Sequence, residues 1–241
     1  MMKFKEILEA ELPEIVRPAV YVVATPIGNA DDITLRALKI LSSVDLVICE
    51  ERKVGSKLLR YWDIKQEMLE LNEHNEQKDS QELAMKIITE NLAAALISDA
   101  GTPLFADPGN RFIPECFERG IHIIPVPGAS SIMAALMAAG VSSESFLYYG
   151  FLPANRQQRQ QAIRRLPSIY DLVILEAPYR LPQLLEDLEK FLGSRRKAVL
   201  CWKLTYPEEQ IIHGDLAYLK QMGANLGKGE FVLLLRAKDG K

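Results

Sequence analysis

Strand-like runs alternate with helix-like segments along the first 140 residues, and this alternation limits the fold more than any other feature of the sequence. The strand-like runs lie at 19–24, 44–49, 67–71, 93–98 and 121–126. The segments between them repeat apolar residues at helical spacing and lie at 33–41, 57–62, 80–92, 110–119 and 130–140. Ser80 is the expected N-cap of one helix, and Gly120 is expected just after the end of another. Strands without polar alternation are typical of parallel sheets buried on both faces, so the pattern predicts an α/β fold.

The composition changes near residue 150, where an aromatic run gives way to a polar stretch. Residues 154–165 contain arginines and no acidic residue. Beyond them, strand-like runs recur at 171–176, 197–204 and 231–236, with helical patterns near 181–192 and 215–222. We therefore expect a domain boundary between Gly150 and Pro153. The expected parts are an N-terminal extension at 1–18, a first α/β domain at 19–150 and a smaller α/β domain at 151–241.

The charge balance excludes a protein held to nucleic acid by its overall charge. Lysine and arginine total 29 against 32 acidic residues, giving a net charge of −3, which still allows a local basic patch. Three widely spaced cysteines argue against a disulfide framework or a cysteine zinc site: Cys49, Cys116 and Cys201. The three histidines have no paired spacing, so we expect no metal site.

The N-terminal segment predicts a cytoplasmic protein. Glutamates interrupt residues 1–18 where a secretory signal would need an unbroken apolar core. The segment resembles a short amphipathic helix stopped by Pro13 and Pro18. No apolar run approaches the roughly 18 residues of a membrane span.

Three turns that follow strand-like runs contain more glycine, proline and polar residues than packing requires, at 25–34, 98–109 and 125–131. The carboxyl ends of parallel strands are where open α/β sheets bind ligands. The Gly101 backbone can approach a ligand closely, and Asp99 and Thr102 can bond hydroxyl or amine groups. Gly128 precedes a helix whose free N–H groups suit an anion. Each turn also fits a structural connection with a capped helix.

Several common sites are missing from the sequence. There is no G-x-G-x-x-G after the first strand-like run, no G-K-[ST] and no G-x-S-x-G. The sequence therefore argues against a nicotinamide cofactor, a nucleoside triphosphate and a serine nucleophile. The three turns instead suit a reaction whose difficult chemistry belongs to a bound cofactor, with the protein positioning the reactants.

Seven segments, in order, resemble those of the small-subunit ribosomal RNA 2′-O-methyltransferase I family, in the tetrapyrrole methylase superfamily. They are TPIGNADDITLRA (25–37), LNEHNE (71–76), SDAGTPLFADPG (98–109), VPGASS (126–131), GFLP (150–153), LEAPYR (175–180) and KGEFVLLL (228–235). The resemblance covers residues 19 to 236, most of the chain.

This resemblance implies two α/β domains, with a mostly parallel sheet in the first and a mixed sheet in the second. It also implies a homodimer that transfers a methyl group from S-adenosylmethionine to the ribose 2′-hydroxyl of a cytidine in 16S ribosomal RNA. The implied donor contacts are Pro26, Asp99, Ala100, Gly101, Thr102, Pro103, Gly128, Ser130, Ser131, Ala177 and Thr205.

The acceptor hydroxyl would gain from a general base, and the sequence leaves three candidates: Glu50, His74 and Asp107. His74 also fits a capping or packing role. Candidate contacts to RNA phosphates are Lys53, Arg156, Arg159, Arg164 and Arg165. The four arginines also fit a solvated helix face, and the 195–197 cations fit a charged turn.

Two departures from the family bear on the substrate. Where the family carries E-D-T-R, Glu50 is followed here by Glu51, Arg52 and Lys53, and lysine does not replace arginine at a bidentate contact. Many family members also continue beyond the last strand, whereas this sequence stops five residues after Arg236. Two alternatives therefore stay open: a tetrapyrrole C-methyltransferase, and a non-catalytic donor- or RNA-binding protein of the same fold.

Overall fold

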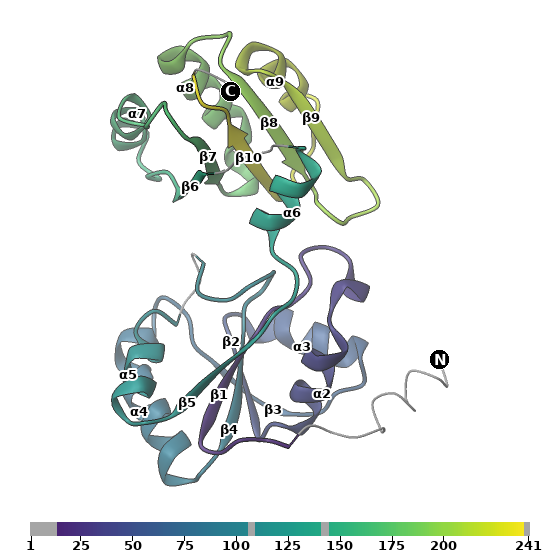
Figure 1. Ribbon diagram of the computed structural model, residues 1–241, viewed down its shortest axis with the longest axis vertical. Coiled ribbons are helices and arrows are strands. Elements are labelled where there is room, and N and C mark those ends of the chain that lie inside the picture. The colour runs from purple at the N-terminus through teal and green to yellow at the C-terminus, as the bar shows by residue number, and fades with distance from the viewer. Residues whose placement is uncertain (1–13, 106–108, 141–144, 239–241) are drawn as a thin grey trace. The chain divides into compact units, whose positions relative to one another are not determined.

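Two units, 1–130 and 131–241, make up the fold, and a computed structural model describes residues 14–105, 109–140 and 145–238 (Figure 1). Each unit contains one five-stranded sheet. Within the described ranges, no helix combines the length and apolar character needed to cross a membrane.

The sheet of the first unit is entirely parallel, as the sequence predicts. Its strand order is β3-β2-β4-β1-β5. The strands are β1 (Ala19–Val23), β2 (Leu46–Cys49), β3 (Glu67–Glu70), β4 (Ala93–Ile97) and β5 (His122–Val126). Every residue of β2 and β4 is buried, which explains their apolar sequences. β1 lies between β4 and β5, so the turns that follow these three strands meet at one sheet edge.

Helices cover both faces of this sheet (Figure 1). α2 (Leu35–Ser43) and α3 (Arg52–Tyr61) pack on one face through residues that include Leu38 and Leu59. α4 (Glu76–Thr89) and α5 (Phe112–Glu118) pack on the other through residues that include Ile87 and Phe112. A 3-10 turn, η1 (Ala30–Asp32), precedes α2, whose first turn is capped by Thr34.

The sheet of the second unit is mixed, which confirms the second part of the predicted fold. Its order is β6-β7-β10-β8-β9, in which β6 and β7 are parallel and the other pairs are antiparallel. The strands are β6 (Phe146–Phe151), β7 (Asp171–Leu175), β8 (Lys197–Trp202), β9 (Gln210–Asp215) and β10 (Phe231–Leu235). The sequence predicts β7, β8 and β10 but not β9.

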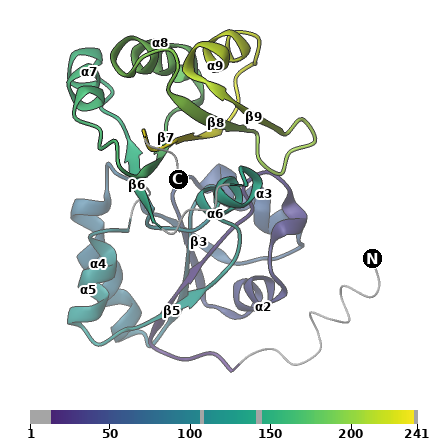
Figure 2. The same ribbon diagram turned by 45° about the horizontal axis from the view of Figure 1, so that its top comes forward.

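Three helices lie together on one face of this sheet: α7 (Arg156–Arg164), α8 (Leu181–Leu192) and α9 (Leu216–Gly223) (Figure 2). Buried leucines of α8, including Leu184 and Leu188, pack against the strands in the core of this unit. α6 (Ser131–Ala138) packs against β10, with the carbonyl of Ala135 3.9 Å from the Cys201 sulfur. A 3-10 turn, η2 (Pro178–Arg180), leads into α8.

The division between the units lies twenty residues before the predicted boundary, which falls inside or just after β6. The prediction was wrong because β6 pairs in parallel with β7, with Phe146 opposite Asp171. β6 therefore belongs to the second sheet, although an aromatic run in sequence does not indicate which sheet it joins. The helix predicted in the N-terminal extension falls mostly at 1–13, outside the described residues.

Candidate functional site

Two of the sequence-predicted turns are joined by their backbones directly beyond the sheet. The N–H of Thr25 donates to the carbonyl of Gly101 at 2.9 Å, and the N–H of Gly101 donates to the carbonyl of Thr25 at 3.1 Å. This reciprocal pair joins the two turns just past the ends of β1 and β4. The turns at 25–34 and 98–105 are therefore held as one rigid surface.

Two buried hydroxyls complete this junction. The Thr25 hydroxyl donates to the Ser98 carbonyl at 3.1 Å and accepts the Gly101 N–H at 3.2 Å. The Ser98 hydroxyl donates to the Gly101 carbonyl at 3.1 Å. Both side chains are buried, so these hydroxyls hold the loop rather than act as nucleophiles. Neither role is predictable from the sequence, because each residue resembles an ordinary turn hydroxyl until its partners are known.

Gly101 and Gly128 are the positions at which the three turns pack closely against one another. Gly101 has φ +90°, and a side-chain carbon added there would lie 3.1 Å from Ile27 Cγ2. A carbon added at Gly128 would lie 3.0 Å from Ala24 Cβ and 3.3 Å from the Ala24 carbonyl. Thr102 ties the third turn to the second, because its hydroxyl donates to the Ala129 carbonyl at 3.0 Å. The three turns thus form a backbone-lined junction, which we call the glycine junction.

Asp99 is the only ionisable residue among the predicted donor contacts. Its Oδ1 accepts the N–H of Glu51 at 3.2 Å, which connects the turn after β4 to the start of α3. Burial raises the pKa of Asp99, the Glu51 N–H opposes that effect and the Glu51 charge adds to it. Pro26 and Thr102 are half-buried, Pro103 is buried and Ala100 is exposed. The predicted donor contacts of the first unit therefore lie at the same edge of its sheet, and Asp99 is the one charged side chain among them.

The candidate bases are not placed alike. Glu50 is half-buried and follows β2, which pairs with β4, so it lies in the segment next to Asp99. His74 follows the edge strand β3, and its side chain is 86% exposed with Nε2 3.9 Å from Glu73. The N–H of His74 donates to the Asn72 side chain at 3.1 Å, so this histidine lies in a tight polar turn. Asp107 lies outside the described residues.

The structure contradicts one of the predicted RNA contacts. Arg159 is 1% exposed, and its Nε and Nη2 donate to Oδ2 of the fully buried Asp187 at 3.1 and 2.9 Å. This guanidinium is used to join α7 to α8 and is inaccessible to RNA. Sequence reasoning grouped it with the other α7 arginines because its partner lies 28 positions away.

The other predicted RNA contacts are accessible, and they differ in their partners. Arg156 lies 3.7 Å from both Glu186 and Asp187, and the Arg164 guanidinium lies over the Phe191 ring at 4.5 Å. Arg165 and Lys53 are exposed. The nearby carboxylates partly neutralise Arg156 and make it a weaker candidate for an RNA contact. Lys53 forms no ion pair with a described residue and stays a candidate.

Ala177 and Thr205 lie at one edge of the second sheet. The Ala177 N–H donates to Oε1 of the buried Glu176 at 2.8 Å, and the Thr205 N–H donates to Glu209 at 2.7 Å. Lys203 and Thr205 have φ +48° and +67°, conformations that are costly for residues with a side chain. The strained turn after β8 had no signal in the sequence. A role of Ala177 and Thr205 in donor binding stays a prediction, as does that of Ser130 and Ser131.

Comparison with known proteins decides the family. Residues 19–220 match the family of tetrapyrrole (corrin/porphyrin) methylases. The ribosomal RNA small subunit methyltransferase I of Vibrio cholerae is 40% identical over 222 residues, which are 90% of this chain and 77% of that protein. The chain belongs to the ribosomal RNA small subunit methyltransferase I family. This confirms the family resemblance of the seven sequence segments.

Solved structures of more distant relatives share the fold of this family. A diphthine synthase superposes with a TM-score of 0.73 at 17% identity, covering 92% of this chain and 91% of its own. The uroporphyrin-III C-methyltransferase of Thermus thermophilus, solved in complex with S-adenosylhomocysteine, gives a TM-score of 0.62 at 18% identity, with 90% and 96% covered. The two-unit α/β architecture is therefore that of the tetrapyrrole methylases. Among the described residues, no group of histidine, cysteine and acidic side chains could hold a metal ion.

Proposed function

We propose that this chain is an S-adenosylmethionine-dependent methyltransferase that methylates the ribose 2′-hydroxyl of a cytidine in 16S ribosomal RNA. The observation that carries the proposal is the glycine junction, found in a chain of the ribosomal RNA small subunit methyltransferase I family. Its backbone groups and single half-buried carboxylate suit a donor that carries both amine and hydroxyl groups.

The residues present fit such a donor. Side-chain carbons added at Gly101 and Gly128 would approach Ile27 and Ala24 to 3.1 and 3.0 Å, so glycine at these positions allows the three turns to pack closely together. The hydrogen bonds between Thr25 and Gly101 hold that backbone in place before anything binds. When bound, the donor supplies a methyl group on a positively charged sulfur. Asp99 would orient the donor by accepting a hydrogen bond from it.

The chain must also accept the proton that the 2′-hydroxyl loses as its oxygen forms the new bond to carbon. We assign this role to Glu50 among the candidate bases, because it follows β2 at the edge that also carries Asp99. Its neighbour Glu51 presents its N–H to Asp99 and offers a matched control. We expect Glu50→Gln to lower kcat by about 10²–10⁴-fold and Glu51→Gln to change it far less. The reverse order would overturn this assignment.

Cytoplasmic location and a homodimer are also part of the proposal. A 16S ribosomal RNA substrate is found where ribosomes assemble, and the family resemblance implies a dimer. Size-exclusion chromatography with light scattering, run over a range of protein concentrations, measures the oligomeric state directly. A single species with a mass close to the 27.1 kDa of one chain would exclude the dimer.

The decisive experiment is a methylation assay with labelled S-adenosylmethionine. The acceptors are 30S subunits, free 16S ribosomal RNA and a porphyrin precursor, each presented to the full chain. Label on a cytidine 2′-oxygen supports the proposal. Label on the porphyrin precursor alone supports the tetrapyrrole alternative, and donor binding without turnover on any acceptor supports the non-catalytic one.

Two glycine variants test whether the glycine junction binds the donor. Gly101 and Gly120 both have positive φ, at +90° and +70°, so alanine strains the backbone at both positions. Gly120 follows α5 with no atom within 4 Å of an added carbon, whereas Gly101 lies in the junction. We expect Gly101→Ala to weaken donor binding and Gly120→Ala to leave it unchanged, as measured by calorimetry. Equal affinities would place the donor elsewhere.

A further inference from the structure

Helix α3 carries a row of cations that form no ion pair with the part of the chain that the structure describes. Arg52, Lys53, Lys57 and Arg60 are exposed on this helix, and Lys65 is exposed on the segment that follows it. None of the five forms an ion pair with another described residue. Helix α3 itself contains no acidic residue. We call these five cations the α3 stripe.

The α3 stripe lowers the stability of the fold through charge repulsion, and its charged groups make no contribution to the core. Lys53, Lys57 and Arg60 are spaced by four and three positions, which places them along one side of the helix over roughly 10 Å. Like charges at this spacing repel one another. The opposite side of the helix packs on the sheet through Gly55 and Leu59, so the cations take no part in the core. Exposed cations that repel one another and have no packing role indicate a surface that binds an anionic partner.

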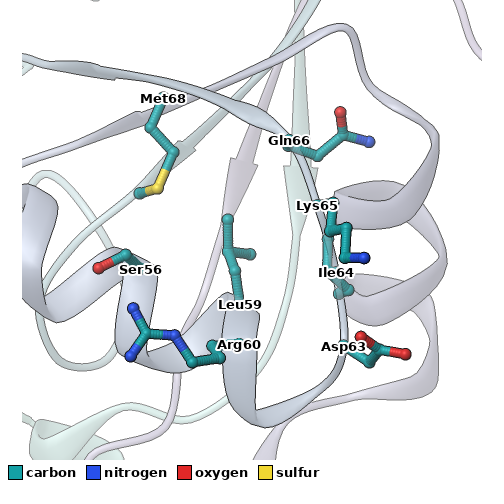
Figure 3. Close-up of a pocket in the computed structure, with 8 residues that line it drawn as sticks. All are labelled: Ser56, Leu59, Arg60, Asp63, Ile64, Lys65, Gln66 and Met68. Atoms are coloured by element: carbon teal, nitrogen blue, oxygen red, sulfur yellow. The ribbon is translucent and has the colours of Figure 1, made fainter.

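A pocket of about 520 Å³ lies at the end of this stripe, between α3 and β3 (Figure 3). Figure 3 shows Ser56 and Arg60 on the helix, Asp63 at the turn, and Lys65 and Gln66 on the chain that returns to the sheet. Leu59, Ile64 and Met68 complete the lining. Asp63 is the single acidic residue of the lining against two cations, so the pocket keeps a positive charge.

An aromatic side chain stands beside the stripe. Tyr61 is 62% exposed, follows Arg60 directly and packs edge-on against Trp62, with ring centroids 5.1 Å apart. Its hydroxyl lies 3.5 Å from Asp31 Oδ1. Surfaces that bind unpaired RNA combine cations placed along the RNA phosphate backbone with exposed aromatic rings on which bases stack. The α3 stripe and Tyr61 together have both features.

The stripe begins at the glycine junction's own edge. The N–H of Glu51, the residue before α3, donates to Asp99 in the turn after β4. An RNA strand bound along α3 would therefore lead toward the turns that we assign to the donor. Arg159 and Lys220 of the second unit are less suited, because each pairs with a carboxylate within 3 Å.

We propose that the α3 stripe binds the phosphates of an unpaired RNA segment next to the methylated nucleotide, with one phosphate at the Arg60–Lys65 pocket. The inference rests on the proposed function, because it takes the partner to be ribosomal RNA. It also resolves a difficulty of that function. A chain with a net charge of −3 has no general attraction for RNA and needs a local surface of this kind.

The test compares two double variants that remove the same charge. Lys57→Gln with Arg60→Gln neutralises half of the helix's cations, and Lys78→Gln with Lys190→Gln removes two exposed lysines from α4 and α8. Binding of the full chain to 16S ribosomal RNA and to 30S subunits is measured by filter retention from 0.05 to 0.4 M salt. A third variant, Lys57→Arg with Arg60→Lys, keeps the charge.

We expect the α3 double variant to bind RNA about 25-fold more weakly at 0.1 M salt, with the slope of log K against log salt reduced by about 1.4. The control pair and the charge-preserving variant should bind like the wild type. Donor affinity should be unchanged, the methylation KM should rise more than kcat falls, and the Tm should not fall, because repulsion is relieved.

Equal losses in both double variants, or no loss in either, would overturn the inference. If wild-type protein methylates 30S subunits while the α3 variant matches the control, the inference fails and the proposed function stands. If the wild type neither binds nor methylates ribosomal RNA, the proposed function fails, and the inference with it.

Discussion

Replacing Arg159 by methionine separates a structural arginine from an RNA contact. The guanidinium donates twice to Asp187 Oδ2 and once, at 3.3 Å, to the carbonyl of Ala154. Methionine fills similar space but removes all of these donors. The Asp187 carboxylate would then stay buried with two remaining partners, both at Oδ1. Gln160 Nε2 donates to it at 2.9 Å, and Arg156 Nε lies 3.7 Å away.

The cost follows from leaving that charge without its partner. Removing one member of a buried ion pair costs about 3–5 kcal/mol. The second unit, Ser131–Lys241, has an unfolding entropy of about 0.23 kcal/mol/K at roughly 2.1 cal/mol/K per residue. The expected fall in Tm for this unit is therefore about 13–21 °C. A double variant that also carries Asp187→Asn should recover part of the loss, because the stranded charge is gone.

Thermal unfolding followed by near-UV circular dichroism measures the change, with Arg156→Met as the control. Arg156 is 54% exposed and its ion pairs are 3.7 Å long, so its loss should cost less than about 1 kcal/mol. An Arg159→Met protein with a wild-type Tm but weakened RNA binding would refute the structural interpretation. It would restore the assignment that the sequence suggested.

Three further predictions concern other parts of the chain. Burial raises the pKa of the Cys49 thiol to about 11, and all three cysteines are buried, so a thiol reagent at pH 8 should label them only after unfolding. Burial would raise the pKa of Asp45, but hydrogen bonds and the charge of Arg17 outweigh it and lower this pKa. Asp45→Asn should therefore destabilise the protein at pH 7, and urea titrations should show the difference disappearing as the pH falls below about 4. Glu76→Gln weakens the acceptor for the Gly109 N–H and should speed proteolysis near residue 109 without lowering Tm greatly.

The central strands of the first unit, β1, β2 and β4, were predictable because burial on both faces leaves a direct record in the sequence. β4 is five consecutive apolar residues, and such a short run between helical patterns is typical of a strand in a buried parallel sheet. β9 was missed because it is an edge strand with a single buried residue, Ile212, and its sequence QIIHGD is polar at both ends. α7 is the converse case, since its sequence is almost entirely polar and its position depends on a buried ion pair that no local pattern shows.

Helix starts were harder to predict than helices. The sequence places the start of α4 at Ser80, but the helix begins at Glu76 and Ser80 is buried inside it. The first turn of α3 was missed because Gly55 resembles a helix breaker. In the structure a side-chain carbon at Gly55 would lie 2.7 Å from Met68 Cε, so this glycine allows the helix to pack closely. Such a role depends on a contact with another element and cannot be read locally.

The glycine junction was predicted in outline because its glycines and Asp99 stand out in composition. The hydroxyls that hold it, Thr25 and Ser98, were not, because a hydroxyl in a turn has many possible roles and only its partners distinguish them. The α3 stripe was seen only at Lys53. The structure adds that Lys57 and Arg60 lie on the same side of α3 as Lys53, and that the stripe forms no ion pair within the described ranges.

Donor and RNA binding should respond differently to salt, because they use different kinds of contact. The glycine junction offers backbone groups and one half-buried carboxylate, so its affinity for the donor should change by less than about twofold between 50 and 200 mM salt. Four phosphate contacts along α3 would instead weaken RNA binding by about 50-fold over the same range. Calorimetry with the donor and filter retention with RNA measure the two dependences. A donor affinity that falls as steeply as the RNA affinity would mean that ion pairs hold the donor, which contradicts the charge-poor site argued from Gly101 and Gly128.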